Sequence, residues 1–254
     1  MRILLISIVL VLLTACQNTT APPRQTAETN LSPVQSVTLE EAMERGGEIF
    51  GKDLYSSAAT DFLLDKGLLN RQSGVLGWIT EFKNDTPTTY FLGKKNDQYY
   101  VVFEVVFNDD DVKLVPSSAI SNELSQKFTV RQDALSAIKS PCSRNYNTVV
   151  LERGDKFIVY ALATTQQQEA IVAGGHYRFT YNKTDNSQVS KERLSKSCMV
   201  LSKADGAVPF TTHILTDGPL EVHAYLGKLH GLFYVSTKNG LFKAYDGKLE
   251  RLKE

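Results

Sequence analysis

The sequence predicts an α+β fold made of antiparallel sheets with packed helices, arranged as two helix-plus-meander lobes. Two observations lead to this prediction. Apolar residues with helical spacing are followed by runs rich in aromatic and β-branched residues, and this order occurs twice along the chain. The 254 residues, 42% of them hydrophobic, also suffice to bury an ordinary globular core. We therefore expect lobes at residues 38–117 and 118–254.

Residues 1–15 have the layout of a secretory signal peptide. Arg2 supplies a positive charge, residues 3–13 are apolar except for Ser7, and small residues follow. The apolar run is about half of the roughly 20 residues that a membrane-spanning helix needs. We expect this segment to be a removable signal and not a permanent anchor.

The signal ends in Leu13-Thr14-Ala15-Cys16, which resembles the lipobox of bacterial lipoproteins. The resemblance covers the first 16 residues. It implies that the thiol of Cys16 receives a diacylglyceryl group, that the signal is cut before Cys16, and that the new amine is acylated with palmitate. The alternative is ordinary signal cleavage, which would leave Cys16 as an exposed thiol.

A lipid on Cys16 would make the protein a membrane protein without a spanning helix. Two or more acyl chains, at roughly 0.8 kcal/mol per buried methylene, give stable anchoring. Gln17 stands where enterobacterial lipoproteins carry an Asp for retention at the inner membrane. For a Gram-negative source, the resemblance therefore implies the periplasmic face of the outer membrane.

Residues 16–37 are polar, contain three prolines and lack a periodic apolar pattern. Such a segment cannot bury enough surface to offset the entropy of ordering it. We expect a lipidated N-terminus followed by a disordered tether.

The first lobe begins with Thr38-Leu39-Glu40-Glu41, which fits the capping box of a helix start. This motif predicts a short helix over 38–45, broken at Gly46-Gly47. A second helix is expected over 53–66, ended by Gly67.

Three strands follow at 75–82, 88–94 and 99–107, and the turn clusters between them predict an antiparallel meander. Strict alternation in the third strand places five residues on one face: Tyr99, Val101, Phe103, Val105 and Phe107. Trp78 is interpreted as a packing residue, with stacking on a ligand as the alternative.

The run Asp109-Asp110-Asp111 raises the question of a calcium site. Calcium draws roughly six to eight oxygens from spaced positions, which three adjacent carboxylates cannot supply. We interpret the run as a solvated hairpin turn and expect no metal and no other cofactor.

The second lobe begins with an amphipathic helix over 120–139, closed by Pro141. A further helix starts at Asp217-Gly218-Pro219 and ends at Gly231. Turns at Asn239-Gly240 and Asp246-Gly247 predict hairpins that make the C-terminus part of the same sheet. The strands expected between the two helices are 148–151, 156–163, 169–173, 176–182 and 188–194.

Cys142 and Cys198 are the only cysteines besides Cys16. If Cys16 carries lipid, they form an even pair in a compartment where disulfides persist, and we expect a bond between them. The alternative is a reactive redox pair, although the C-x-x-C spacing is missing.

Three of the four histidines, His213, His223 and His230, lie near one another in the sequence, and Glu221 precedes the last two. On a helix, His223 and His230 share a face but lie about 10 Å apart, which is too far for one zinc ion. Structural histidines are the preferred interpretation, and a metal or catalytic cluster is the alternative.

His176 and Arg178 form a second candidate. Alternation sends both to one polar face of a strand, after two glycines that would let a ligand approach. They would suit an anionic group such as a carboxylate or phosphate. The alternative is a solvated face or a face paired across strands.

The balance of charge and the missing motifs argue against nucleic-acid binding and against several classes of enzyme. Twenty-eight basic residues balance twenty-eight acidic ones, so we expect no nucleic-acid partner. Nucleophile elbow, zinc helix, P-loop and dinucleotide motifs are absent from the sequence.

The sequence is compatible with three functions. The preferred one is a lipid-anchored, non-catalytic binding or adaptor protein of the cell envelope, whose partner is an envelope protein or an anionic ligand. The first alternative is an envelope enzyme that uses His176 or the cluster of His213, His223 and His230. The second is a periplasmic inhibitor or immunity protein.

Overall fold

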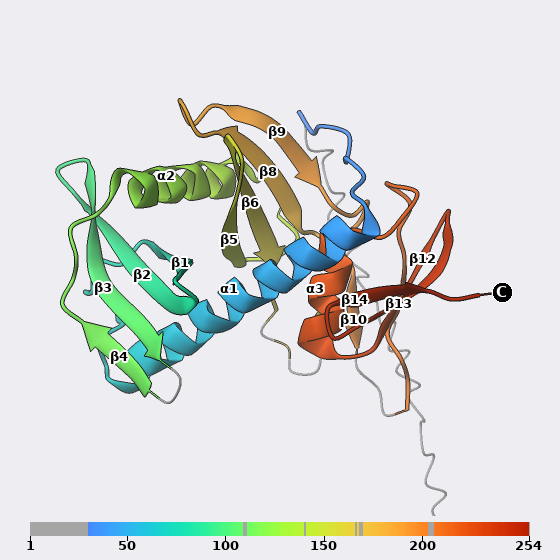
Figure 1. Ribbon diagram of the computed structural model, residues 1–254, viewed down its shortest axis with the longest axis horizontal. Coiled ribbons are helices and arrows are strands. Elements are labelled where there is room, and N and C mark those ends of the chain that lie inside the picture. The colour runs from blue at the N-terminus through green and yellow to red at the C-terminus, as the bar shows by residue number, and fades with distance from the viewer. Residues whose placement is uncertain are drawn as a thin grey trace, which may run out of the picture.

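Figure 1 shows the computed structural model of the protein, which describes residues 30–108, 111–139, 141–165, 167, 170–202 and 206–253. Within these residues there are three helices, and fourteen strands form four sheets. Neighbouring strands are antiparallel except for one parallel pair. The α+β fold class is confirmed. The helices are α1 (Leu39–Asp65), α2 (Asn122–Ala137) and α3 (Glu221–His230).

Helix α1 runs the length of the folded part, from the C-terminal sheet to the first sheet (Figure 1). The hydroxyl of Thr38 accepts a hydrogen bond from the backbone N–H of Glu41 at 3.1 Å, as expected for a helix cap. At the other end, Gly67 has a φ of 66° and donates to Leu64, while Leu68 donates to Leu63. These two bonds form the Schellman motif that ends the helix.

The predicted break at Gly46-Gly47 is wrong, because α1 continues through both glycines. The reason is a close crossing with α3. A Cβ atom on Gly46 would lie 2.6 Å from the Cβ of Ala224 and 2.8 Å from the carbonyl oxygen of Glu221. Gly46 is therefore a packing glycine that lets two helix backbones meet, and not a helix breaker.

The two glycines differ in their surroundings and make a matched pair for mutation. We expect Gly46→Ala to destabilise the protein by about 1–3 kcal/mol, because the new methyl group overlaps α3. A Cβ atom on Gly47 would have no neighbouring atom within 4 Å. Gly47→Ala should therefore stabilise the protein by up to about 1 kcal/mol through helix propensity. Urea unfolding of both variants measures the change in the free energy of unfolding. A change of the same sign in both variants would contradict the packing role of Gly46.

The first sheet has the order β1-β2-β3-β4, with α1 on one face and α2 on the other. The strict alternation predicted for β3 is wrong, because the β2–β3 register shifts between Phe91 and Leu92. Val101 consequently faces the α2 side, whereas Val105 faces the α1 side. The strands are β1 (Gly77–Lys83), β2 (Thr86–Lys95), β3 (Gln98–Asn108) and β4 (Asp111–Val115).

The connection between β3 and β4 contains the aspartate run. Asn108 pairs with Asp111, which begins β4. Asp109 and Asp110 lie outside the described residues, so the hairpin interpretation stays a prediction for them.

The second sheet has the order β5-β6-β8-β9, and its inner faces carry most of the large buried aromatic side chains. The strand expected at 169–173 is not part of this meander. It forms β7, which pairs with β10 in a separate two-stranded sheet. The strands are β5 (Tyr146–Arg153), β6 (Lys156–Ala163), β7 (Ala170–Val172), β8 (Tyr177–Asn182), β9 (Gln188–Arg193) and β10 (Val200–Ser202).

The C-terminal strands do not join the second sheet as predicted but form a sheet of their own, which packs on α3 (Figure 1). The turn between β13 and β14 uses Asp246 and Gly247 with φ angles of 45° and 76°, as a tight hairpin requires. The strands are β11 (Phe210–Thr212), β12 (Phe233–Thr237), β13 (Gly240–Tyr245) and β14 (Lys248–Arg251), with β11 parallel to β12.

Part of the predicted tether is ordered. Ser32 donates its backbone N–H to Lys191 of β9 at 2.7 Å, and Val34 and Val37 pack against the core. The expectation of a disordered chain is therefore wrong for residues 30–37, while residues 16–29 lie outside the described part. The burial of the two valines and the hydrogen bond to β9 offset the entropy of ordering this segment.

The two predicted lobes share their hydrophobic cores across residue 117. One cluster joins Ala42 and Ile49 of α1 to β5, β6 and α3. Another joins Ile79 and Tyr90 of the first sheet to α2 and the second sheet. Packing therefore couples the lobes continuously through α1 and α2.

Candidate functional site

Cys142 and Cys198 form a disulfide, which confirms that prediction. Their Cα atoms lie 5.3 Å apart, and the bond ties the segment after α2 to the segment after β9. Gly175 lies against the bond with a φ of 90°, and a Cβ there would be 2.3 Å from the Cβ of Cys142. One glycine of the predicted ligand-approach motif therefore makes room for the disulfide and not for a ligand.

Arg178 lies in a buried ionic network and not on a solvated face. Its side chain is 3% exposed. Nη1 donates to Oε1 of Glu221 at 2.7 Å, and Nη2 donates to Oε2 of Glu192 at 2.5 Å. Arg178 and Glu192 face each other across β8 and β9, which matches the cross-strand alternative. With two carboxylates already bound, Arg178 is not available to an anionic ligand.

The rest of this network fixes the N-terminal segment and the start of α3. Gln35 donates its N–H to Glu192 at 2.9 Å and accepts from Arg178 at 2.7 Å. Tyr160 donates to Glu221 at 2.8 Å. Burial, reinforced by the charge of Glu221, raises the pKa of Tyr160 well above its ordinary value. These contacts join the N-terminal segment, three strands of the second sheet and α3, so the network is structural.

His176 is also structural. Its Nδ1 accepts from the N–H of Ala163 at 3.0 Å, which leaves Nε2 to donate to the carbonyl of Val172 at 2.9 Å. Burial lowers the pKa of His176 to about 4, so the ring is neutral at pH 7. Both ring nitrogens are occupied, and His176 has no free atom for catalysis.

His213 and His223 come together, although sequence spacing paired His223 with His230. Their ring centroids lie 4.9 Å apart with the rings nearly perpendicular. Helix α3 places His223 at its first turn, and His213 follows directly after β11. His230 lies at the far end of α3 and is partly exposed. The pair therefore joins a loop to a helix and does not follow one helix face.

The hydrogen bonds of this pair define its tautomers. Nδ1 of His223 accepts from the N–H of Leu220 at 2.8 Å, so its proton is on Nε2. Thr216 donates its hydroxyl to Gly218, so it accepts from Nε2 of His213 at 2.8 Å. The ring nitrogens left without a partner in the described part are therefore an acceptor, Nδ1 of His213, and a donor, Nε2 of His223.

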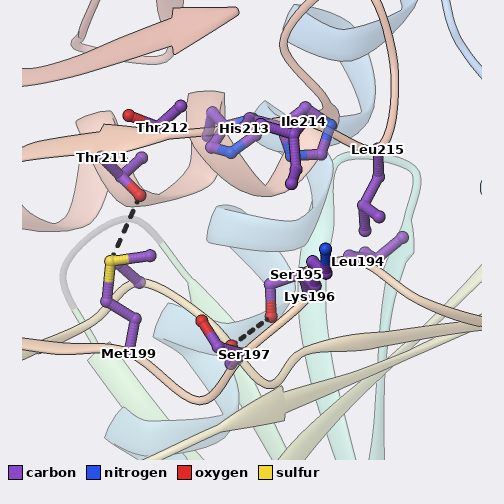
Figure 2. Close-up of a pocket in the computed structure, with 12 residues that line it drawn as sticks. Leu194, Ser195, Lys196, Ser197, Met199, Thr211, Thr212, His213, Ile214 and Leu215 are labelled. Carbon is purple, nitrogen blue, oxygen red and sulfur yellow. Dashed lines mark hydrogen bonds between the residues drawn. The ribbon is translucent and has the colours of Figure 1, made fainter.

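Both histidines line a pocket of about 520 Å³ between the segments 194–199 and 211–215 (Figure 2). Its remaining wall is mainly apolar and includes Leu194, Met199 and Ile214. Burial lowers the pKa of His213 to about 4 and that of His223 well below its ordinary value, with the neighbouring ring as a second cause for His223. The pocket thus presents two neutral imidazoles to its contents at pH 7.

Comparison with protein-family models, with curated proteins and with solved structures gave no similar chain. The chemistry of the pocket is therefore the basis for assigning its ligand.

The described residues do not gather a metal centre, since no three His, Cys, Asp or Glu side chains among them are placed to hold one ion. His213 and His223 alone supply two ligands, fewer than the three protein ligands of a catalytic zinc site. Among the described helices, none is both long and apolar enough to cross a membrane.

The sequence pattern singled out both histidines but not the opposite wall of the pocket. Ser195, Lys196, Ser197 and Met199 carry no motif, and they reach the site because the disulfide at Cys198 holds their segment. The exposed apolar side chain of Ile214, at 62%, marks this wall only in the structure, because exposure cannot be read from sequence.

The buried histidines make stability depend on pH. Because their pKa values lie below the unfolded value of about 6.5, the unfolded chain binds more protons as the pH falls toward 4. Stability is therefore fully present above about pH 6.5 and is lost below it. For His213, whose pKa is about 4, we expect a loss of about 2 kcal/mol between pH 7 and pH 5.

Urea unfolding of wild type and His213→Gln at both pH values isolates this contribution. The stability difference between the two proteins should shrink by about 2 kcal/mol from pH 7 to pH 5, because Gln does not titrate. A difference that stays constant would show that His213 is not held neutral in the folded protein.

Proposed function

We propose that the protein is a lipid-anchored, non-catalytic binding protein of the cell envelope, and that the pocket at His213 and His223 receives an apolar peptide segment of an envelope partner. The observation that carries this proposal is the pair of neutral imidazoles, one with a free acceptor and one with a free donor among the described residues. A peptide amide offers the complementary donor and acceptor.

The other properties of the pocket support a peptide ligand. Apolar atoms form most of its exposed surface, and such a surface favours apolar side chains on either side of an amide. Its charged residue, Lys196, is solvent-exposed, so the binding surface is uncharged inside. An uncharged pocket with a single donor and acceptor pair favours recognition over acid–base catalysis, because the imidazoles do not take up protons near pH 7.

The anchor rests on the lipobox resemblance at Cys16, which lies outside the described residues. The ordered segment from residue 30 leaves only a short stretch between the lipid and the folded part. In the proposed arrangement the domain is held close to the periplasmic face of the outer membrane, where envelope proteins are its neighbours.

Fractionation of cells that express Cys16→Ala tests the anchor. Wild-type protein should sediment with membranes and have an intact mass increased by its acyl chains, whereas the variant should be soluble or retain its signal. A wild-type protein with an unmodified Cys16 thiol in the membrane fraction would contradict the anchor.

Photo-crosslinking in cells tests the pocket. A photoreactive residue at position 214, at the pocket wall, should give a discrete cross-linked species that mass spectrometry can identify. The matched control is position 64 on α1, because Leu64 is similarly apolar and 52% exposed but lies outside the pocket. Identical products from both positions, or none from position 214, would contradict the proposed binding site. Cross-linking from position 214 should also weaken in His223→Ala, which removes the donor.

A further inference from the structure

Arg131 is a buried cation without an acidic partner in the described part of the chain. It lies on α2 with a side chain only 3% exposed. Nε donates to the hydroxyl of Thr148 at 2.7 Å, and Nη1 donates to the side-chain oxygen of Gln132. Both acceptors are neutral. Among the described residues, Nη2 has no acceptor and no carboxylate lies within ion-pair distance of Arg131.

The contrast with Arg178 shows why this is unusual. Both guanidinium groups are buried to the same extent, but Arg178 has two carboxylates, whereas the described residues offer none to Arg131. Burial lowers the pKa of Arg131 to about 10, so the group still carries its charge at pH 7. A buried charge is costly unless an opposite charge or several hydrogen bonds compensate it.

Aromatic rings compensate only part of this cost. The central carbon of the guanidinium lies 5.4 Å from the ring centroids of both Trp78 and Phe128. Such cation–π contacts are weaker than the cost of desolvating a full charge. The backbone of Gly77 also lies against the group, since a Cβ there would be 2.4 Å from Nη1. Packing therefore holds the guanidinium in place without neutralising it.

The guanidinium borders a cavity of about 780 Å³, which shares no lining residue with the histidine pocket. Arg144 adds a second, exposed cation, and none of the described residues that line the cavity is acidic. Apolar side chains form one part of the wall: Leu135, Ile138 and Pro141. Leu135 follows Arg131 by one helical turn, so charge and apolar surface lie on one face of α2.

A second polar group in the wall also lacks a partner. The indole N–H of Trp78 is buried and has no acceptor in the described residues. Two donor groups with unused hydrogen-bonding capacity, one of them charged, thus belong to residues that line the same cavity.

We propose that this cavity binds an organic carboxylate with an apolar body. The carboxylate accepts from Arg131 and supplies its counter-ion, while the apolar part lies on Leu135 and Ile138. A planar carboxylate matches the guanidinium fork, and the apolar wall favours it over inorganic phosphate. The source of the carboxylate is either a free aliphatic acid or the C-terminus of a peptide, and the two are separated by experiment.

The test uses Trp78 as a reporter, because it is the only tryptophan in the chain. Purified full-length protein is titrated with hexanoate, and with hexanamide as the neutral control of the same shape. We expect a saturable change in tryptophan fluorescence with hexanoate and none with hexanamide. N-acetyl-leucyl-leucine and its C-terminal amide form the peptide arm. Tighter binding of the peptide acid would assign the site to a peptide C-terminus, and tighter binding of hexanoate would assign it to a free acid.

Variants separate binding from a purely structural role. Arg131→Met should bind hexanoate at least about tenfold more weakly but unfold at the same temperature as wild type or higher, because it removes an uncompensated buried charge. Arg144→Met at the rim should weaken binding only a few-fold. Arg153→Met, which removes a cation paired with Glu48 outside the cavity, should leave it unchanged.

Three results would overturn the proposal: equal responses to hexanoate and hexanamide, no saturable response in wild type at millimolar concentration, or unchanged hexanoate binding by Arg131→Met. A strongly lowered unfolding temperature of Arg131→Met, together with hexanoate binding retained in that variant, would instead assign Arg131 to the core. If Arg131→Met does not fold, Arg131→Lys provides the measurement, since it keeps the charge but loses the planar fork.

Discussion

Replacing Arg178 with Met should lower the free energy of unfolding by about 3–5 kcal/mol. The substitution keeps a side chain of similar length but removes the cation that Glu192 and Glu221 share. Both carboxylates are nearly inaccessible, at 1% and 0% exposed, so water cannot replace the lost hydrogen bonds without opening the core. Chemical unfolding of the purified protein at pH 7 measures the effect.

The matched control is Lys238→Met. Lys238 also pairs with a carboxylate, that of Asp217, but both side chains are mostly exposed. Such a pair contributes less than about 1 kcal/mol. A loss in Arg178→Met no larger than in this control would show that the buried network does not hold the fold together.

Arg178→Met should also release the N-terminal segment. Gln35 accepts a hydrogen bond from Arg178 and donates one to Glu192, although 143 positions separate Gln35 from Arg178. Protease cleavage around residues 30–37 should therefore accelerate in the variant relative to wild type and to Lys238→Met.

Removing the disulfide should have an effect of similar size. The Cys142→Ala/Cys198→Ala double variant loses a cross-link between residues 56 positions apart, which corresponds to about 4 kcal/mol in the chain-entropy description. For a folded part of this length, the thermal midpoint should fall by roughly 8–16 °C. Thermal unfolding under non-reducing conditions measures the shift.

Reductant supplies the control for this experiment. It should lower the midpoint of wild type toward that of the double variant and leave the double variant unchanged, because the double variant has lost the bond that reductant breaks. The segment 194–199 should also lose its position, since Cys198 holds it. A peptide bound at His213 and His223 would then bind more weakly. Hexanoate binding at Arg131 should weaken as well, because Pro141 and Ser143 of its cavity flank Cys142.

Much of the fold was predictable because the signals are local. The end of α1 at Gly67 and the hairpin turn at Asp246-Gly247 depend on backbone angles that a few adjacent residues determine. The disulfide was predictable from cysteine number once Cys16 was assigned to lipid. In each case a short stretch, or a simple count, carries the information.

The errors arose where a local pattern has two physical explanations. Gly46 is compatible with a helix break or with a close helix crossing, and only the position of α3 distinguishes them. Val101 and Val105 are four positions apart, so regular alternation would place them on the same face. The register shift between β2 and β3 sends them to opposite faces. The C-terminal hairpins have clear turn signals, which say nothing about the sheet that the strands join.

The sequence by itself determined the α+β class and the approximate positions of most strands and helices, because periodicity and turn chemistry act over a few residues. It also determined the pairing of Cys142 with Cys198, because only two cysteines remain besides Cys16. Only the tertiary structure decided three features: the burial of Arg178 with Glu192 and Glu221, the pairing of His213 with His223, and the burial of Arg131 away from every described carboxylate. Burial and charge compensation depend on which distant segments pack together, so the same residue type is a core residue in one place and a candidate binding group in another.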